Sequence, residues 1–278
     1  MSRWAVERTY ELIGVPIRIA SDVPDLEPLL ERVCRDLTPT DRSPVVTISI
    51  RSEPEGFRAW VDETMRSEVL AFDQSFMKAM SLLHEQTMEQ CGLWAVHAGV
   101  VSRRGVVMAM PGKSGAGKST LVATCVSAGW DYVSDEALAF DDETMEVVPY
   151  PKPIWIDRRA TELVGLPRQA LPVTPSRYKY PVTPSDLGGT VAEGPLHLKA
   201  VVVPERDPTA DGIEQVPLRR AELVTILLRH TFKRSRDSEA KFDRAVRVAR
   251  RIDGLRLRFS HAKDAVEVLD GVLSTYGS

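Results

Sequence analysis

The sequence predicts an α/β (α+β) fold, with a small N-terminal α+β domain over residues 1–91 and a larger second domain over residues 92–278. Two observations predict this fold. Short β-branched segments alternate with amphipathic segments of helical spacing, without internal repeats or low-complexity tracts. In the second part of the chain, a glycine-rich loop stands between an apolar strand and a helix.

The composition is that of an ordinary globular protein. Of 278 residues, 43% are hydrophobic and 27% charged, and 36 basic against 39 acidic residues give a net charge of −3. This balance excludes binding to nucleic acid or anionic membranes by bulk charge. No apolar run reaches the roughly 18 residues of a membrane span, and early charges argue against a signal peptide. Three cysteines without metal-ligand spacing fit a reducing compartment, so we expect a cytoplasmic protein.

The first 91 residues predict a small domain of strands and helices. Alternation over residues 10–20 and a β-branched run over 45–50 predict strands on either side of a helix over 26–37. Residues 57–72 predict a further strand or hairpin, and apolar residues at helical spacing predict a helix over 73–90. No residue of this domain has a chemistry that we can identify. A role in recognising the molecule on which the rest of the chain acts is a hypothesis for this domain.

The second domain differs in its residue pattern, because its predicted strands are longer and more apolar. Residues 165–198 hold six prolines and little periodicity, which predicts a long irregular loop of a length that is usually functional or disordered. Strands are predicted over 93–102, 106–110, 132–140, 146–149, 199–204 and 255–259. Helices are predicted over 119–128, 219–233, 238–251 and 264–273.

The strongest signal is a phosphate-binding loop with the pattern G-x-x-x-x-G-K-[ST] over residues 112–119. Its glycines allow a tight turn that exposes successive N–H groups, and the following helix adds its positive dipole end. We expect Lys118 to reach the β- and γ-phosphates and the Ser119 hydroxyl to join a Mg²⁺ shell. The predicted nucleotide-binding residues are Gly112, Lys113, Ser114, Gly115, Ala116, Gly117, Lys118, Ser119 and Thr120.

Two further side chains are candidate partners of the loop. Asp135 ends a short apolar stretch after the loop helix, where a carboxylate is needed to hold Mg²⁺ or to take a proton from an attacking hydroxyl. His97 interrupts an apolar strand before the loop. For His97 the alternative interpretation is a core histidine with satisfied hydrogen bonds.

With these residues the chain resembles the HPr kinase/phosphorylase group. It is more similar to the HPr-kinase-like relatives, some of which are serine kinases of ribosomally made peptides. The resemblance runs from V-H-A-G (96–99) through the loop to S-D-E (134–136), extends weakly to P-Y-P-K-P (149–153), and covers about the last two thirds of the chain. It implies a P-loop kinase core related to the phosphoenolpyruvate carboxykinase fold, with a mixed, largely antiparallel sheet.

The resemblance also implies a role for individual residues. Asp135, His97 and Lys118 would be catalytic, with Asp135 acting on a serine hydroxyl. Mg²⁺ would be held by Ser119, Asp135 and Glu136. Thr120 stands where the bifunctional enzymes have glutamate, which favours kinase over phosphorylase activity.

We therefore expect a kinase that depends on ATP and Mg²⁺ and transfers the γ-phosphate to a serine hydroxyl of a peptide or small protein. A ribosomally made peptide precursor is one such acceptor. Two alternatives stay open: a kinase of a small-molecule alcohol, and a P-loop ATP-binding sensor or assembly module without kinase activity. Founding members of the resembled family form rings, so a homo-oligomer is also open. No nucleic-acid or membrane partner is expected.

Two weaker features have both a structural and a functional interpretation. Lys152 lies in a stiff, proline-flanked segment, where it either meets a phosphate or belongs to a surface turn. Arg177 and Lys179 lie near the middle of the 165–198 loop, which is either a substrate lid or an irregular segment.

Overall fold

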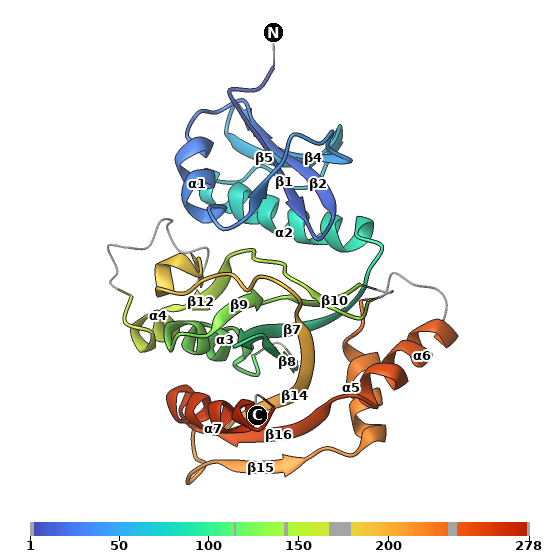
Figure 1. The fold of residues 1–278 in the computed structure, drawn as a ribbon. Coiled ribbons are helices and arrows are strands. Elements are labelled where there is room, and N and C mark those ends of the chain that lie inside the picture. Colours follow the sequence, from blue (N-terminus) through green and yellow to red (C-terminus); the bar gives the residue numbers. More distant parts are fainter. Residues whose placement is uncertain (1–2, 114, 142–143, 167–178, 233–237, 277–278) are drawn as a thin grey trace.

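A computed structural model of the protein describes residues 3–113, 115–141, 144–166, 179–232 and 238–276. These residues form two larger sheets of mixed strand direction and one two-stranded ribbon. The long helix α2 (Phe72–Gln90) lies between the N-terminal sheet and the larger sheet (Figure 1). The predicted mixed α/β architecture is confirmed.

The N-terminal sheet is built on a hairpin. The alternation over residues 10–20 predicted one strand, but the chain reverses at Ile13 and Gly14, which both have positive φ, so the segment divides between two antiparallel strands. Helix α1 (Leu26–Val33) then connects β2 to its parallel neighbour β4. The strand order is β3-β1-β2-β4-β5-β6. The strands are β1 (Val6–Leu12), β2 (Val15–Ser21), β3 (Thr38–Pro39), β4 (Val46–Glu53), β5 (Gly56–Val61) and β6 (Thr64–Met65).

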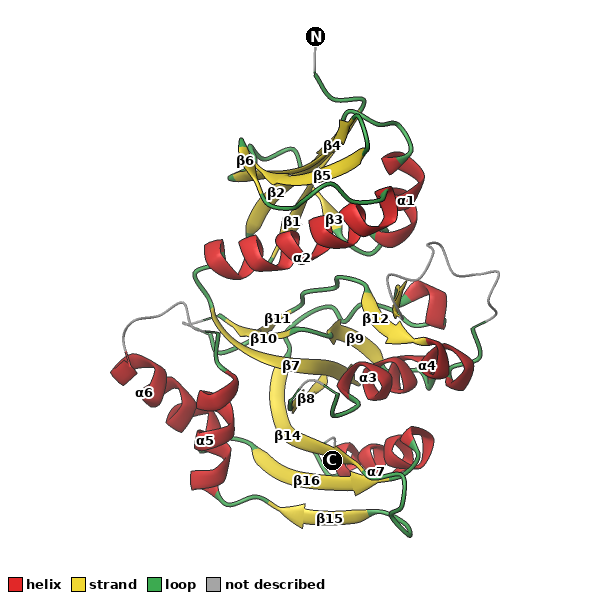
Figure 2. Cartoon of the chain, turned by 180° about the vertical axis from the view of Figure 1, so that it is seen from behind, coloured by secondary structure: helices red, strands yellow, loops and turns green. Residues whose placement is uncertain are grey.

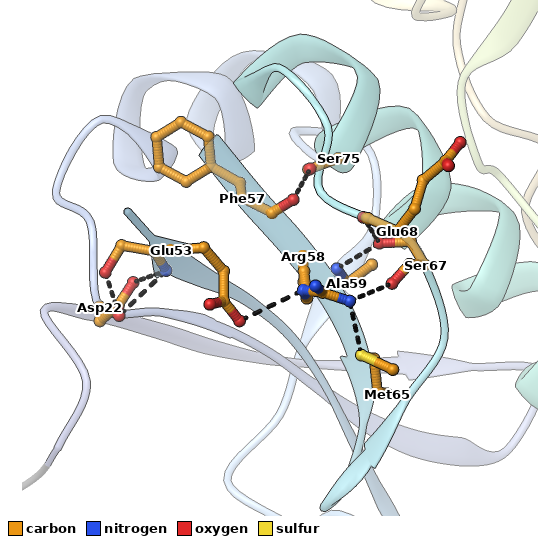
Figure 3. Close-up of polar contacts among 10 residues, drawn as sticks. Asp22, Glu53, Phe57, Arg58, Ala59, Met65, Ser67, Glu68 and Ser75 are labelled. Atoms are coloured by element: carbon orange, nitrogen blue, oxygen red, sulfur yellow. Dashed lines mark hydrogen bonds and ion pairs between the residues drawn. The ribbon is translucent and has the colours of Figure 1, made fainter. Parts of the chain in front are cut away.

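Polar contacts fasten strand β5 to the segment that leads into α2 (Figure 3). The Ser67 hydroxyl accepts a hydrogen bond from the Ala59 amide at 2.9 Å, and the Ser75 hydroxyl donates to the Phe57 carbonyl at 3.1 Å. Arg58, also on β5, pairs with Glu53 at the end of β4 at 3.4 Å. Residues 57–72 were predicted to form a strand or a hairpin, and the structure has a hairpin of β5 and β6. An irregular run follows, which the Ser67 contact holds against β5.

Helix α2 contributes to one hydrophobic cluster with both sheets. Its Phe76 and Leu83 are buried together with core residues of the N-terminal sheet. The same cluster contains Ala139 of the larger sheet and Tyr150. The two parts of the chain therefore share a packed core through α2, and the domain boundary after residue 91 stays a prediction.

The larger sheet is mixed, as the resemblance implies. Strand β8 is parallel to β14, and β14 is parallel to β16, while the other pairings are antiparallel. The strand order is β11-β10-β7-β8-β14-β16-β15, with β9 also paired to β7. The strands are β7 (Trp94–Arg103), β8 (Val106–Pro111), β9 (Asp131–Ser134), β10 (Ala137–Phe140), β11 (Val147–Val148), β14 (His197–Arg206), β15 (Glu214–Pro217) and β16 (Asp253–Phe259).

Helices cover both faces of this sheet (Figures 1 and 2). Alternate strand residues take part in two different clusters: Met108 packs with α3 (Lys118–Ser127) and α7 (Ala262–Ser274), and Val107 with α5 (Arg220–His230) and α6 (Ser238–Ala249). Among the described residues, no helix combines the length and apolar character that crossing a membrane requires.

The predicted irregular loop over residues 165–198 is wrong in part. Strand β13 (Lys179–Val182) pairs antiparallel with β12 (Ile154–Asp157), and a short 3₁₀ helix covers Ser185–Leu187. Helix α4 (Arg158–Leu163) follows β12. The two strands pair with segments about 25 residues away, so the sequence around each one has no clear strand pattern of its own. The prolines were therefore the strongest local feature, and they predicted a loop. Residues 167–178, including Arg177, lie outside the described residues.

Candidate active site

The predicted phosphate-binding loop connects strand β8 to helix α3. Gly115 and Gly117 have φ values of +84° and +88°, a region that residues with a Cβ rarely adopt, which explains both glycines. Lys118 is the first residue of α3 and is 7% exposed. Its ammonium donates to the carbonyl oxygens of Gly112 at 2.8 Å and Lys113 at 3.1 Å, so it lies across the loop. Ser114 lies outside the described residues.

The S-D-E segment fills the interruption between strands β9 and β10. Ser134 is fully buried, and its hydroxyl accepts hydrogen bonds from the amides of Glu136 and Ala137 at 3.1 and 3.0 Å. This side-chain turn ends β9 and restarts β10 along the same edge of β7. Asp135 and Glu136 are therefore held at a fixed break in the sheet.

Asp135 faces the start of the loop helix. Its side chain is 4% exposed and lines the same pocket as Ser119. Burial, reinforced by the neighbouring Glu136 charge, raises the pKa of Asp135 to about 7. Its Oδ1 atom is buried without a hydrogen-bond partner among the described residues. Close to neutral pH this side chain therefore exists in both protonation states.

Gly99 of the V-H-A-G segment makes room for this arrangement. A Cβ atom at Gly99 would lie 2.6 Å from Val122 Cγ2 on α3, closer than packed carbon atoms approach. The same position is 3.9 Å from Asp135 Oδ1 and 3.9 Å from Lys118 Cβ. The missing side chain thus lets α3, Asp135 and β7 meet.

His97 lies beside Glu136. Its Nδ1 is 3.0 Å from the Glu136 carbonyl oxygen and 3.5 Å from Glu136 Oε2. A carbonyl oxygen only accepts, so Nδ1 carries the proton and the other ring nitrogen, Nε2, is an acceptor in the neutral ring. Burial and the Lys118 charge lower the pKa of His97, which favours this neutral form. His97 is therefore half-buried and polar rather than a core residue.

Glu136 is paired with Lys152. The Lys152 ammonium donates to Glu136 Oε1 at 3.1 Å, and the lysine side chain is only 7% exposed. Burial opposes ionisation of Glu136, but the cations around it, above all Lys152, lower its pKa overall. The interpretation of Lys152 as part of a surface turn is wrong. The prediction that Glu136 holds a metal stays a prediction.

One pocket of about 340 Å³ brings the predicted side chains together. The loop and α3 contribute its floor, the break between β9 and β10 one wall, and the β12–β13 ribbon another. Its lining residues are His97, Gly115, Gly117, Lys118, Ser119, Thr120, Asp135, Glu136, Trp155, Ile156, Asp157, Lys179 and Arg206. Lys179, predicted within an irregular loop, thus stands on β13 at the rim of this pocket.

Arg206 and Asp157 are lining residues that the sequence analysis missed. Arg206 ends β14, whose carboxyl end lies beside that of β8 because the strands are parallel. Its neighbours Glu205 and Asp207 pair with Arg256 and Arg258, whereas Arg206 makes no ion pair among the described residues. Knowing that β8 and β14 are adjacent would have pointed to this end of the strand.

A second pocket of about 210 Å³ adjoins the first. The two share four lining residues: Gly117, Thr120, Asp157 and Arg206. Beyond them the second pocket is lined by α4 and by the junction of β16 with α7, including Phe259 and His261. The two pockets therefore lie side by side at the start of α3.

The residues around Asp135 fit a Mg²⁺ ion. The Ser119 hydroxyl and the Asp135 carboxylate supply hard oxygen ligands, the kind that Mg²⁺ takes in nucleotide sites together with phosphate oxygens. The buried Asp135 Oδ1 without a partner is the atom left over for such a ligand bond. Among the described residues, no group of three or more His, Cys, Asp and Glu side chains is arranged to hold a metal by itself.

Comparison with known proteins gives little. No family model matches the chain, and no curated protein matches it. Among solved structures, the Hpr(Ser) kinase/phosphatase from Coxiella burnetii is similar with a TM-score of 0.31 and 13% identity, over 66% of this chain and 99% of that chain. At this TM-score the similarity assigns neither a fold family nor an activity to the chain.

Proposed function

We propose that the protein is a kinase that uses ATP and Mg²⁺ to phosphorylate a serine hydroxyl of a peptide or small protein. One observation carries the proposal: Lys118 and Ser119 of the loop share a pocket with the buried carboxyl group of Asp135. A cation, exposed loop amides and a titrating carboxylate are the groups that phosphoryl transfer requires.

In this proposal the loop amides and Lys118 bind the phosphates and spread the negative charge that develops on the transferring group. The bond of Lys118 to its own loop carbonyls fixes the ammonium at the loop, where a phosphate oxygen can replace those carbonyls. Bound Mg²⁺, held by Ser119 and Asp135, would neutralise phosphate charge. Asp135 also orients the acceptor hydroxyl and takes its proton, a role that suits a pKa of about 7.

His97 adds a hydrogen-bond acceptor to the same pocket. With its Nδ1 proton given to the Glu136 carbonyl, His97 keeps a free lone pair on Nε2. We assign it to alignment of the acceptor hydroxyl, because a carboxylate and an imidazole on one wall hold such a group in two directions.

The adjoining pocket suits the nucleoside of ATP. It begins at Gly117 and Thr120, next to the amides that would hold the phosphates, and continues between α4 and the start of α7. Arg206 stands where the two pockets meet and has no acidic partner among the described residues, so we assign it to a phosphate oxygen near the nucleoside. The acceptor would then enter from the side of His97 and Lys179.

The test is incubation of the full-length protein with γ-labelled ATP and Mg²⁺. Candidate acceptors are peptides encoded by neighbouring reading frames, and small alcohols and sugars in parallel, with the product read by mass spectrometry. We expect label on a peptide serine with the wild type and none with D135N, while D135N still binds ATP.

Other outcomes identify the alternatives. Label on a small alcohol alone would make the protein a small-molecule kinase. Slow ATP hydrolysis without any labelled acceptor would favour a sensor or assembly module. Loss of Mg²⁺-dependent ATP binding in D135N would make metal binding the main role of Asp135, whereas retained binding without transfer would make its main role that of the base.

A further inference from the structure

Lys152 is a buried charge outside the pocket. Its side chain is 7% exposed, and it does not belong to the side chains that line the phosphate pocket. A buried ammonium is costly unless it is paired and hydrogen-bonded. Lys152 has such a partner in Glu136, whose carboxylate lies 3.1 Å away.

The backbone around Lys152 is fixed from several directions. The fully buried Tyr132 donates its hydroxyl hydrogen to the Lys152 carbonyl at 2.8 Å. The Lys152 amide donates to the Tyr150 carbonyl at 2.9 Å. Pro151 and Pro153 flank the residue and restrict its backbone. The lysine therefore has little freedom to follow Glu136 if that carboxylate moves.

Aromatic rings from distant segments pack near this pair. The His84 ring on α2 stacks on the Tyr150 ring with 5.8 Å between the ring centroids, and it meets the Phe232 ring edge to face with 5.6 Å between centroids. Phe232 also contacts the His97 ring at 6.0 Å. Rings from distant segments thus pack against one another and against His97, at one end of the Lys152–Glu136–His97 row.

The row decides where Glu136 points. One carboxylate oxygen meets Lys152 and the other lies 3.5 Å from His97 Nδ1, so both oxygens have a partner. The neighbouring acid, Asp135, makes neither contact: it is buried near Lys118 at the start of α3, and its Oδ1 has no hydrogen-bond partner among the described residues. The two adjacent carboxylates therefore have different surroundings.

We propose that Lys152 is a positioning residue that holds Glu136 against His97 and leaves Asp135 as the single carboxylate of the pair directed at the phosphate-binding loop. This inference rests on the proposed kinase function for its activity readout. It predicts that Lys152 acts on catalysis through Glu136 and not by contacting nucleotide.

The experiment compares K152M, K152R, E136Q and the double variant K152M/E136Q, with K199M on the exposed face of β14 as a control. We expect K152M to lower kcat by about tenfold or more, as loss of a residue that orients a site ligand does. The KM for ATP should stay within about twofold, and K152R should retain most of kcat. In the E136Q background, K152M should lower kcat little further.

Two results would overturn the inference. An equal loss of kcat on removing Lys152 with and without Glu136 would show independent action. A raised KM for ATP with unchanged kcat would make Lys152 a nucleotide ligand. K152R and the double variant leave no unpaired buried carboxylate, so they report on the pair even if K152M unfolds.

A crystal structure of K152R and of the double variant tests the positioning without any activity. Glu136 should keep its contact with His97 in K152R, and the glutamine side chain introduced by E136Q should leave His97 in the double variant. An unchanged position of this side chain without Lys152 would contradict the inference. If the wild type transfers no phosphate, the proposed function fails, and these structures still decide the role of Lys152.

Discussion

The two parts of the chain bury different kinds of polar groups. The buried polar residues of the N-terminal sheet and α2 are uncharged: Ser21, Ser49, Ser75, Gln86 and Thr87. In the larger part, Lys118, Asp135 and Lys152 are each at most 7% exposed. Charged groups of the N-terminal part pair at the surface instead, as Arg3 does with Glu63. Buried charge is costly, so its concentration around one pocket marks the region where function and not folding determines the residues.

The largest effect should follow from removing the buried cation of the loop. K118M should lower phosphoryl transfer by at least about 100-fold, because it deletes a charge directed at the developing negative charge. K199M is the control: Lys199 carries the same charge at an exposed position on β14, outside both pockets. Initial rates with labelled ATP measure both. Equal losses in the two variants would remove the distinction between buried and exposed charge.

The next effect is on stability. G99A should lower the free energy of unfolding by about 1–3 kcal/mol, because its methyl group would lie 2.6 Å from Val122. G271A is the control: a Cβ at Gly271 in α7 meets nothing within 4 Å, and alanine favours the helix by about 0.5–1 kcal/mol. Urea denaturation measures both. Unchanged stability of G99A would mean that α3 does not need this close approach.

The next prediction concerns how the free energy of unfolding depends on pH through His84, on the helix α2 that joins the two parts. Burial, with a contribution from Lys152, lowers the pKa of His84 to about 4. The unfolded chain then binds the proton more strongly than the folded protein between pH 4 and 6.5, so this contribution to stability is complete above pH 6.5 and is lost toward pH 4.

H84F should remove that dependence. The difference in unfolding free energy between wild type and H84F should change by at most about 1.4 kcal/mol per pH unit within the window and be constant above it. Asp135 titrates oppositely, because its raised pKa makes the folded protein bind the proton more strongly, but it does so in both proteins and cancels. Urea denaturation at several pH values is the measurement; parallel curves would place His84 in solvent.

The smallest effect belongs to the N-terminal surface. E63Q removes a carboxylate that pairs with Arg3 and Arg51 but is 71% exposed. Surface pairs of this kind contribute little because water screens them. The thermal unfolding midpoint and the transfer rate should both stay at the wild-type values. A clear loss of activity would extend the functional site into the N-terminal part.

The sequence predicted the elements whose conformation depends on neighbouring residues in the chain. The loop over residues 112–119 and its flanking strand and helix are specified by glycine conformation and helical spacing, and the structure has β8 and α3 within a residue of the predicted bounds. The β12–β13 ribbon could not be predicted, because its two strands gain their partners only when segments 25 residues apart meet. Arg206 was missed for a related reason, since only the parallel pairing of β14 with β8 brings it to the loop.

The candidate site divides in the same way. His97 and Asp135 were chosen as isolated polar residues in apolar segments, and the pairing of β7 with β9 and β10 places them on one pocket. The burial of Lys152 could not be predicted from its own segment, because neighbouring Tyr150 packs with α2 and Phe232, which are distant in the sequence.

The most direct measurement is a crystal structure of the full-length protein with Mg²⁺ and an ATP analogue that cannot transfer its terminal phosphate. We predict phosphates on the loop amides, with the terminal one between Lys118 and Asp135 and the nucleoside between α4 and α7. An analogue bound elsewhere, or a terminal phosphate from which Asp135 faces away, would contradict the assignment of this pocket to phosphoryl transfer.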